Sequence, residues 1–121
     1  MSALLLLGVG LLGGIGALAR FVLDGAVAAR LVRSFPFGTL VVNLSGAFGL
    51  GLLVGAIVGD DALRLAGTGF LGAYTTFSTW ALESHRLGED GQRALGLVNF
   101  AVSLILGVLA AWIGEELARG L

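Results

Sequence analysis

Charged side chains interrupt the hydrophobic pattern of this chain at only a few places. Between them lie four charge-free runs of 19, 23, 18 and 21 residues, at positions 1–19, 37–59, 65–82 and 94–114. A helix rises about 1.5 Å per residue, so ~20 residues cross a hydrocarbon layer of ~30 Å. Because lipid offers a backbone no hydrogen-bond partners, each run is expected to be helical. We therefore predict four membrane-spanning helices, at about residues 3–29, 37–59, 62–86 and 92–117.

Composition supports a membrane protein and excludes several functions. Of the 121 residues, 57% are hydrophobic and 12% charged, against roughly 25% charged in soluble domains, and the mean hydropathy is +1.00. With no cysteine, thiol chemistry is excluded, and a net charge of −1 provides no basic surface for nucleic acid. No nucleophile elbow, zinc-binding helix or phosphate-binding loop motif indicates an enzyme. His85 has no nearby ligand pair and is expected at the surface. The chain is predicted to form one domain, residues 1–121.

Local signals refine the helix boundaries. The first helix is expected to end near Ala29, and Pro36 suits the first turn of the second helix. Asp60 and Asp61 can cap the third helix. Residues 88–91 form a short turn before the fourth helix. Four spans place both termini on one side of the membrane.

The arginines give a weak signal for orientation. Four fall on the side of the first and third connections and two on the side of the termini: Arg30, Arg33, Arg86 and Arg93 against Arg64 and Arg119. Taken literally, the positive-inside rule places the termini outside. The bias is small enough for the chain to insert in both orientations.

Small residues recur at every fourth position of the second predicted helix and share one face: Ala47, Gly51, Gly55 and Gly59. Such a stripe lets another helix approach closely, either within the subunit or between subunits. Asn43 extends the stripe, and a buried amide in a membrane needs partners. Asn43 is therefore either interhelical glue or a pore ligand.

Polar residues also occur inside the fourth and first predicted helices. The fourth helix carries a stripe that is either a packing surface or a polar track: Asn99, Ser103, Gly107 and Ala111. On the first helix, the spacing of Arg20 and Asp24 permits an ion pair on a face that looks into protein or water. The alternative is an arginine that extends to the membrane surface.

The most informative segment, residues 67–80, places three glycines before a cluster of hydroxyl residues, Gly-Thr-Gly-Phe-Leu-Gly-Ala-Tyr-Thr-Thr-Phe-Ser-Thr-Trp. This is weak helix-forming material near the middle of a span. Unwinding here would free backbone carbonyls to line a cavity or hold an ion, and carbonyl and hydroxyl oxygens suit a hard cation such as Na⁺. The alternative is a continuous helix in which Ser and Thr hydroxyls bond to preceding carbonyls.

Two aromatic residues and a hydroxyl stripe belong to the same segment. Phe77 and Trp80 lie on one side of the predicted helix, where they either pack in the core or present their positive ring edges to an anion. Thr75, Thr79 and Glu83 form another stripe, whose hydroxyl donors can carry a dehydrated anion. Glu83 is alternatively a solvated charge at the helix end.

At these positions the sequence resembles the small bacterial fluoride channels over nearly the whole chain. The similarity comprises residues 13–17 with Arg20, then Gly38, Thr39, Val42, Asn43 and Gly46, and then residues 69–83. Its most specific part is residues 75–79, Thr-Thr-Phe-Ser-Thr, followed by Glu83.

The resemblance implies an all-α membrane fold of four transmembrane helices with a break in the third, assembled as an antiparallel, dual-topology homodimer. It implies two fluoride pores per dimer and a structural Na⁺, not transported, on the carbonyls of Gly72 and Thr75. The implied pore residues are Arg20, Asn43, Phe77, Ser78, Thr79, Trp80, Glu83 and Ser103. Trp80 stands where a second phenylalanine is common, and Asn99 and Gly107 depart from the Tyr and Ser of some members.

The implied activity is passive export of fluoride across the bacterial inner membrane, which confers fluoride resistance. A pore for this strongly hydrated ion must replace water with donors that do not bind too tightly. Two other classes remain. A proton-coupled small-multidrug-type antiporter needs an embedded carboxylate in the first helix, where the only acid is Asp24. A non-transporting structural subunit would not need hydroxyls around Phe77.

Overall fold

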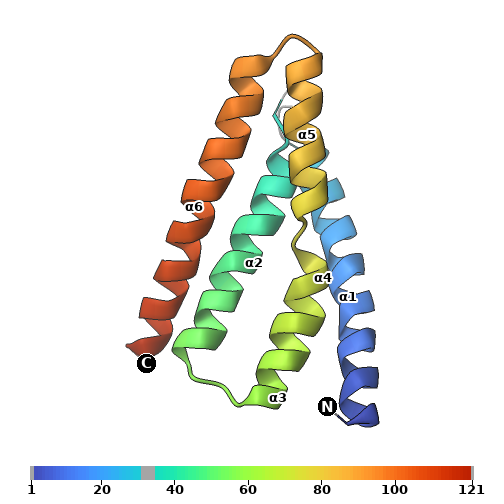
Figure 1. The fold of residues 1–121 in the computed structure, drawn as a ribbon, viewed down its shortest axis with the longest axis vertical. Helices are drawn as coiled ribbons and strands as arrows, with labels where there is room; N and C mark the ends of the chain where they lie inside the picture. Colours follow the sequence, from blue (N-terminus) through green and yellow to red (C-terminus); the bar gives the residue numbers. More distant parts are fainter. Residues whose placement is uncertain (1, 31–34, 121) are drawn as a thin grey trace.

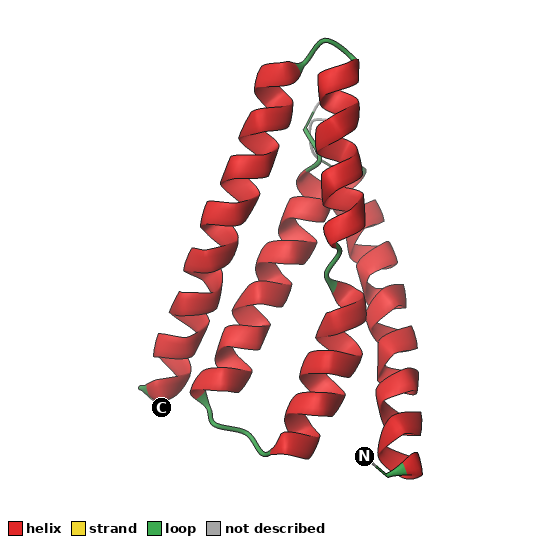
Figure 2. Cartoon of the chain, in the orientation of Figure 1, coloured by secondary structure: helices red, strands yellow, loops and turns green. Residues whose placement is uncertain are grey.

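The computed structural model describes residues 2–30 and 35–120, except for the side chain of Ser78. The described chain is all-helical, and its helices form four rods (Figures 1 and 2). The elements in chain order are α1 (Ala3–Ala28), α2 (Phe37–Gly55), α3 (Asp60–Ala62), η1 (Leu63–Leu71), α4 (Gly72–Tyr74), α5 (Phe77–Glu89) and α6 (Arg93–Arg119). Three of them, α1, α2 and α6, are long and apolar enough to cross a membrane. The remaining rod is built from α3, η1, α4 and α5.

The first rod is a continuous helix that packs against the middle of the chain. Ser2 caps α1 by accepting a hydrogen bond from the Leu5 amide, and Ala29 ends the helix. Along its length α1 contacts η1, α4 and α2. At the crossing with η1, a Cβ on Gly16 would overlap the carbonyl oxygen of Phe70, so this approach requires glycine.

Glycines also bring α2 and α6 together. Added Cβ atoms on Gly51 and Gly55 would overlap the carbonyls of Ala111 and Glu115, and one on Gly114 would overlap a carbonyl of α2. The stripe on α2 is therefore used for packing within the subunit at these positions. Removing a side chain lets two backbones approach, which is how membrane helices gain contact without a hydrophobic drive.

Helix α2 begins at the predicted residue but ends earlier than predicted. It begins at Phe37 with Pro36 in the capping position, outside the first turn. It ends at Gly55, short of residue 59, because Ile57 adopts a left-handed conformation with φ of 54°. Gly59 therefore lies outside the helix and is not part of its packing stripe. The amides of Ile57 and Val58 satisfy the last carbonyls of α2.

The third rod begins with one short turn of α-helix, which continues as a wider π-helix. Gly59, rather than Asp60 or Asp61, occupies the capping position of α3, and neither aspartate caps through its side chain. Both lie in the first turn, where negative charge offsets the helix dipole. The nine residues of η1 then form a π-helix, so the glycine-rich segment widens the helix instead of unwinding it.

The break in the third rod falls between α4 and α5. Thr75 and Thr76 both adopt extended backbone conformations, with φ, ψ values of −79°, 157° and −144°, 118°. Figure 2 shows this interruption as a short loop within the third rod. The hydroxyl side chains of both residues satisfy neighbouring backbone groups, as described below, which makes the interruption compatible with a membrane interior.

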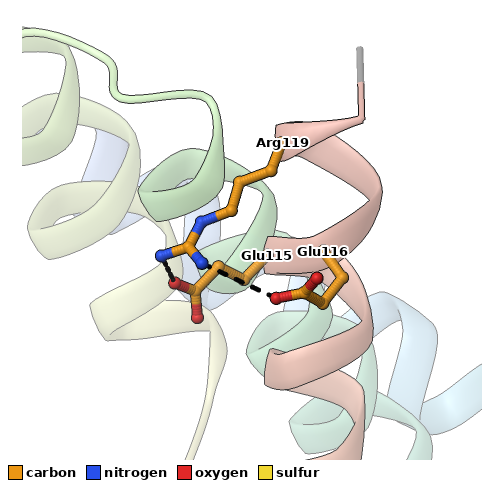
Figure 3. A network of polar contacts seen from close by, with 3 residues as sticks. All are labelled: Glu115, Glu116 and Arg119. Atoms are coloured by element: carbon orange, nitrogen blue, oxygen red, sulfur yellow. Dashed lines mark hydrogen bonds and ion pairs between the residues drawn. The ribbon is translucent and has the colours of Figure 1, made fainter.

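A turn closes one end of the molecule, and ion pairs and the chain termini lie at the other. Helix α5 extends to Glu89, and the turn to α6 is centred on Asp90 and Gly91, the latter with φ of 79°. At the opposite end, Arg119 forms ion pairs with Glu115 and Glu116 in the last turns of α6 (Figure 3). Both chain termini lie at this second end (Figure 1).

Candidate functional site

The side chains of Thr75 and Thr76 stabilise the helix break through hydrogen bonds to neighbouring backbone groups. The hydroxyl of Thr75 donates to the carbonyl oxygen of Leu71 at 3.0 Å, which closes the end of α4. The hydroxyl oxygen of Thr76 accepts a hydrogen bond from the Thr79 amide at 3.2 Å and caps α5. The break is therefore an ordered feature in which one residue ends a helix and the next begins another.

Asn43 fastens α2 to the same break. Its side-chain Nδ2 donates to the carbonyl of Thr76 at 2.9 Å, and its Oδ1 accepts from the amide of Thr76 at 2.8 Å. One amide side chain thus satisfies both backbone groups of a residue that lies outside a helix. The sequence left interhelical glue and pore ligand open for Asn43. These bonds show that it joins α2 to the break, and its role as a pore ligand stays a prediction.

A cavity of about 500 Å³ opens beside the break, between α2, the third rod and α6. Its polar lining comes from Asn43, Thr75, Thr76 and Ser103, and its aromatic lining from Phe77 and Trp80. Small residues widen it: Gly46, Ala47, Gly67, Gly72, Gly107 and Ala111. None of the described residues that line the cavity carries a charge. The walls can offer hydrogen bonds and ring edges without presenting a full charge.

Three aromatic rings form a continuous group at the α5 side of the cavity. The rings of Phe77 and Trp80 lie 5.1 Å apart at 76°, an edge-to-face arrangement. Trp80 also stacks on Phe100 of α6, with centroids 4.9 Å apart and planes inclined by 19°. Phe77 is 71% exposed within the single chain, whereas Trp80 is buried. Of the two rings that line the cavity, Phe77 is therefore the more exposed in the single chain.

A polar network ties Trp80 to α6. The indole Nε1 donates to the carbonyl of Asn99 at 3.3 Å, and the Asn99 side chain donates from Nδ2 to the hydroxyl of Ser84 at 2.7 Å. Ser103 donates to Asn99 Oδ1 at 3.4 Å. Asn99 is almost completely buried and is not a cavity-lining residue, whereas Ser103 is. Of the predicted α6 stripe, Ser103, Gly107 and Ala111 face the cavity and Asn99 lies behind it.

Arg20 contacts the end of α4 instead of its predicted partner. Its Nε donates to the carbonyl of Ala73 at 3.3 Å, where a cation offsets the negative end of a helix dipole. None of the ion pairs in the described part of the chain joins Arg20 to Asp24. The side chain of Asp24 lies instead against the backbone of Gly38, where an added Cβ would overlap its Oδ1. The predicted ion pair is therefore absent.

The predicted hydroxyl stripe is divided by the break. Thr75 is the first of the two extended residues and lies before α5, so it does not share a helix face with Thr79 and Glu83 of α5. Thr79 accepts a hydrogen bond from the Thr76 hydroxyl at 3.1 Å, and neither it nor Glu83 lines the cavity. Within the described residues, Oε1 of Glu83 is buried without a hydrogen-bond partner. The side chain of Ser78 and all of Arg33 lie outside the described residues.

Sequence reasoning missed the pair formed by Tyr74 and Ser45. Their hydroxyls are 2.8 Å apart, and Tyr74 is buried beside the break. Gly46 makes room for this contact, because a Cβ there would overlap the Thr75 methyl group. The sequence offered one signal for this contact: Gly46, a small residue that follows Ser45 directly. His85, in contrast, is exposed as expected and pairs with Glu89 at 2.7 Å.

Metal ligation by side chains finds no support among the described residues, which contain no group of three His, Cys, Asp or Glu side chains around one point. Gly72 and Thr75 instead begin and follow α4, and both line the cavity. A cation at this place would bind backbone carbonyls.

The fold and cavity together define a class, that of small multi-pass membrane proteins with an uncharged, largely apolar cavity that carries a few polar groups at a broken helix. Comparison with known proteins specifies it further. The chain belongs to the family described as CrcB-like protein, Camphor Resistance (CrcB), whose model matches residues 7–115.

Several relatives have names that state a function. The chain is 59% identical over 112 residues to the fluoride-specific ion channel FluC 2 of Mycolicibacterium paratuberculosis, covering 93% of this chain and 92% of that protein. It is 56% identical over 113 residues to FluC 2 of Mycobacterium tuberculosis, covering 93% and 90%. The fluoride-specific ion channel FluC of Citrifermentans bemidjiense is 46% identical over 118 residues, covering 93% and 95%. The family is thus one of membrane channels and not of enzymes.

Proposed function

We propose that this protein is a fluoride-selective, passive channel that exports cytoplasmic fluoride and confers fluoride resistance. The observation that carries the proposal is the cavity at the helix break, where uncharged donors and aromatic edges gather and no described lining residue is charged. The names of relatives up to 59% identical support fluoride as the ion.

The lining groups suit a small, strongly hydrated anion. Conduction requires that a site replace the hydration shell and yet release the ion, which weak donors at several positions achieve better than one cationic group. Asn43 retains a second amide hydrogen that no described residue accepts. The hydroxyl of Ser103 and the rim of Phe77 border the same cavity. These three groups are the first candidates for direct contact with fluoride.

The remaining predicted pore residues extend the path away from the cavity. Ser78, Thr79 and Glu83 follow the break on α5 and lead toward the α5–α6 end of the molecule. Arg20 donates to the end of α4 and places a positive charge near the break without entering the cavity lining. We assign Thr79 and Ser78 as donors along this path and Glu83 to its mouth.

The residues at the break fit a structural Na⁺. Helix α4 ends at Tyr74, so its last carbonyls lack partners from a following helical turn. The negative end of a broken helix is a cation site in membrane proteins. The carbonyls of Gly72 and Thr75 would hold the ion, which would add positive potential beside the anion path without a charged side chain. Two ligands from one chain are too few, so further ligands would come from a second copy.

A second copy, inserted in the opposite orientation, completes the proposed channel. The open cavity between the third rod and α6 offers it a contact surface, and α6 lies against α2 and α5 but not against η1. The weak arginine bias permits both orientations. Fluoride then leaves the cell down its electrochemical gradient, with the membrane potential contributing about 2.3 kcal/mol per charge per 100 mV.

Fluoride efflux from proteoliposomes tests the function. Vesicles loaded with potassium fluoride and made permeable to potassium are expected to release fluoride to an ion-selective electrode, with or without a pH gradient. Protein-free vesicles provide the baseline. Release that depends on a proton gradient would favour an antiporter, and retention equal to that of protein-free vesicles would exclude a channel.

A further inference from the structure

Asn99 occupies an unusual position for a polar residue in a membrane helix. Its side chain is 1% exposed and lies between α5 and α6, behind the wall of the cavity. A buried amide is costly unless its donors and acceptors are satisfied. The groups that satisfy this amide therefore indicate why it is placed there.

Two of the residues bonded to Asn99 line the cavity, although Asn99 itself does not. Trp80 donates its indole N–H to the Asn99 carbonyl at 3.3 Å, and Ser103 donates its hydroxyl to Asn99 Oδ1 at 3.4 Å. The third partner, Ser84, accepts from Asn99 Nδ2 and donates to the carbonyl of Trp80 at 2.9 Å. The indole is thus held by the backbone carbonyl of Asn99, and the Asn99 side chain reaches the Trp80 backbone through the hydroxyl of Ser84.

We propose that Asn99 is a positioning residue for anion selectivity, which sets the orientation of Trp80 and of the Ser103 hydroxyl at the cavity wall. This inference rests on the proposed function, since it assigns a role to a residue that acts on the anion path only through two others.

The orientation of Trp80 decides which part of the indole meets the path. An indole N–H is a strong donor with no acceptor capacity. Because this N–H is bonded to α6, it is not free to bind an anion tightly, and only the carbon-bound hydrogens of the ring, which attract an anion more weakly, are left for the path. Trp80 also meets Phe77 edge-to-face, so a rotation of the indole would alter the most accessible ring of the site.

The contact with Ser103 is long, whereas the contact with Ser84 is short. At 3.4 Å the Ser103 bond is weaker than an ordinary hydroxyl hydrogen bond, which has its optimum near 2.7–2.8 Å. The Ser103 hydroxyl therefore donates only weakly to Asn99 Oδ1, and it can exchange this hydrogen bond for one to an anion in the cavity. The 2.7 Å bond to Ser84 keeps the amide itself in place. Gly96 permits this arrangement, because a Cβ there would crowd the carbonyl of Ser84.

Replacement of Asn99 by a residue of similar volume tests the proposal. Asn99→Leu removes the side-chain bonds to Ser84 and Ser103 while keeping the site filled, and it leaves the backbone carbonyl that accepts from the Trp80 indole. It is made in a Trp112→Phe background, where Trp80 is the only tryptophan and reports its own environment by fluorescence. Leu87→Ala is the matched control, since Leu87 lies near Gly96 at the same α5–α6 contact but is not a cavity-lining residue. Asn99→Ser replaces the leucine variant if that variant does not assemble.

The expected result is a loss of selectivity with an altered Trp80 environment. Relative to the Trp112→Phe parent, the fluoride-to-chloride flux ratio should fall about fivefold, equivalent to ~1 kcal/mol. Trp80 emission should shift, because α5 loses the Asn99–Ser84 bond to α6 beside Trp80 and the packing around the indole changes. Adding Trp80→Phe should make the effect of Asn99→Leu smaller, because coupled residues are not additive. Leu87→Ala should reduce stability and leave the flux ratio unchanged.

Three results would overturn the assignment: an unchanged flux ratio and emission in Asn99→Leu, the same behaviour in Leu87→Ala as in Asn99→Leu, or full additivity with Trp80→Phe. A parent that carries no fluoride would instead contradict the proposed function. In that case the Trp80 emission alone decides whether Asn99 orients the indole.

Discussion

Asn43 joins its helix to the break through both polar ends of one side chain. The two hydrogen bonds to Thr76 resemble the paired bonds between neighbouring strands and leave one amide hydrogen directed elsewhere. A residue that both holds the break and borders the cavity links the position of α2 to the shape of the proposed path.

Substitution of Asn43→Asp tests both roles. A carboxylate retains the acceptor for the Thr76 amide but loses the donor to the Thr76 carbonyl and adds a negative charge to the cavity wall. Repulsion between like charges at ~4 Å amounts to about 4 kcal/mol near a protein surface, so fluoride flux is expected to fall at least tenfold. Electrode-monitored efflux measures the change. Parental rates in this variant would remove Asn43 from the fluoride path.

Phe77 is the second residue for which flux gives a direct answer. Phe77→Ile removes the aromatic rim and the edge-to-face contact with Trp80 while keeping a large apolar side chain. Because an aromatic contact contributes about 1 kcal/mol, we expect fluoride flux to fall roughly five- to tenfold and size-exclusion behaviour to stay unchanged. Phe21→Ile on α1 is a matched control, since Phe21 is similarly exposed, at 78%, and does not line the cavity. Equal fluxes in the two variants would contradict a pore role for Phe77.

At the scale of the element, glycines decide how closely the rods approach one another. Gly16 and Gly14 lie on the same helix but in opposite surroundings. A methyl group on Gly16 would overlap the Phe70 carbonyl, whereas one on Gly14 would meet no heavy atom within 4 Å. Alanine substitutions at these two glycines therefore distinguish the loss of stability caused by crowding from the gain caused by the higher helix propensity of alanine.

Gly16→Ala is expected to destabilise the protein by about 1–3 kcal/mol, because α1 must move away from η1. Gly14→Ala should be neutral or stabilise by up to ~1 kcal/mol, since alanine favours a helix. Unfolding followed by circular dichroism in detergent measures both variants. A similar loss of stability in the two would show that the α1–η1 contact is not the cause.

The elements follow from the sequence to different degrees. Charge-free runs are sufficient to indicate helices near α1, α2 and α6, because hydrocarbon thickness sets their length. The end of α2 was not predictable, since it depends on Ile57 adopting a conformation that is uncommon for a branched residue. Residues 67–80 left unwinding and a continuous helix open, and the structure has a break within this segment, at Thr75 and Thr76. The π-helix over the preceding residues was not expected.

The candidate site likewise has features that the sequence predicts and features that it does not. Asn43, Phe77, Trp80 and Ser103, all expected near a pore, line one cavity. The bond from Arg20 to the Ala73 carbonyl joins residues 53 positions apart, so no local spacing indicates it. The i, i+4 pattern permitted Asp24 as the partner of Arg20, with an arginine extending to the membrane surface as the alternative, but the carbonyl of Ala73 at the end of α4 accepts from Arg20 instead.

At the scale of the whole molecule, the proposed Na⁺ connects folding to assembly. A ligand that binds only the assembled protein stabilises it by about 2.7 kcal/mol at one hundred times its Kd. Replacing Na⁺ by N-methyl-D-glucamine should therefore lower the unfolding temperature of the purified protein and reduce fluoride efflux. Potassium at equal ionic strength is the control. Identical stability and flux in all three salts would contradict a structural Na⁺ at Gly72 and Thr75.

The position of the termini has a practical consequence for protein engineering. Both chain ends leave the bundle at the same end (Figure 1). In a pair of oppositely inserted copies, the C-terminus of one and the N-terminus of the other lie on different sides of the bilayer. A tandem fusion that joins them by a flexible hydrophilic tether alone would force both halves into the same orientation. A covalently linked pair of opposite orientation therefore requires an added apolar helix in the tether.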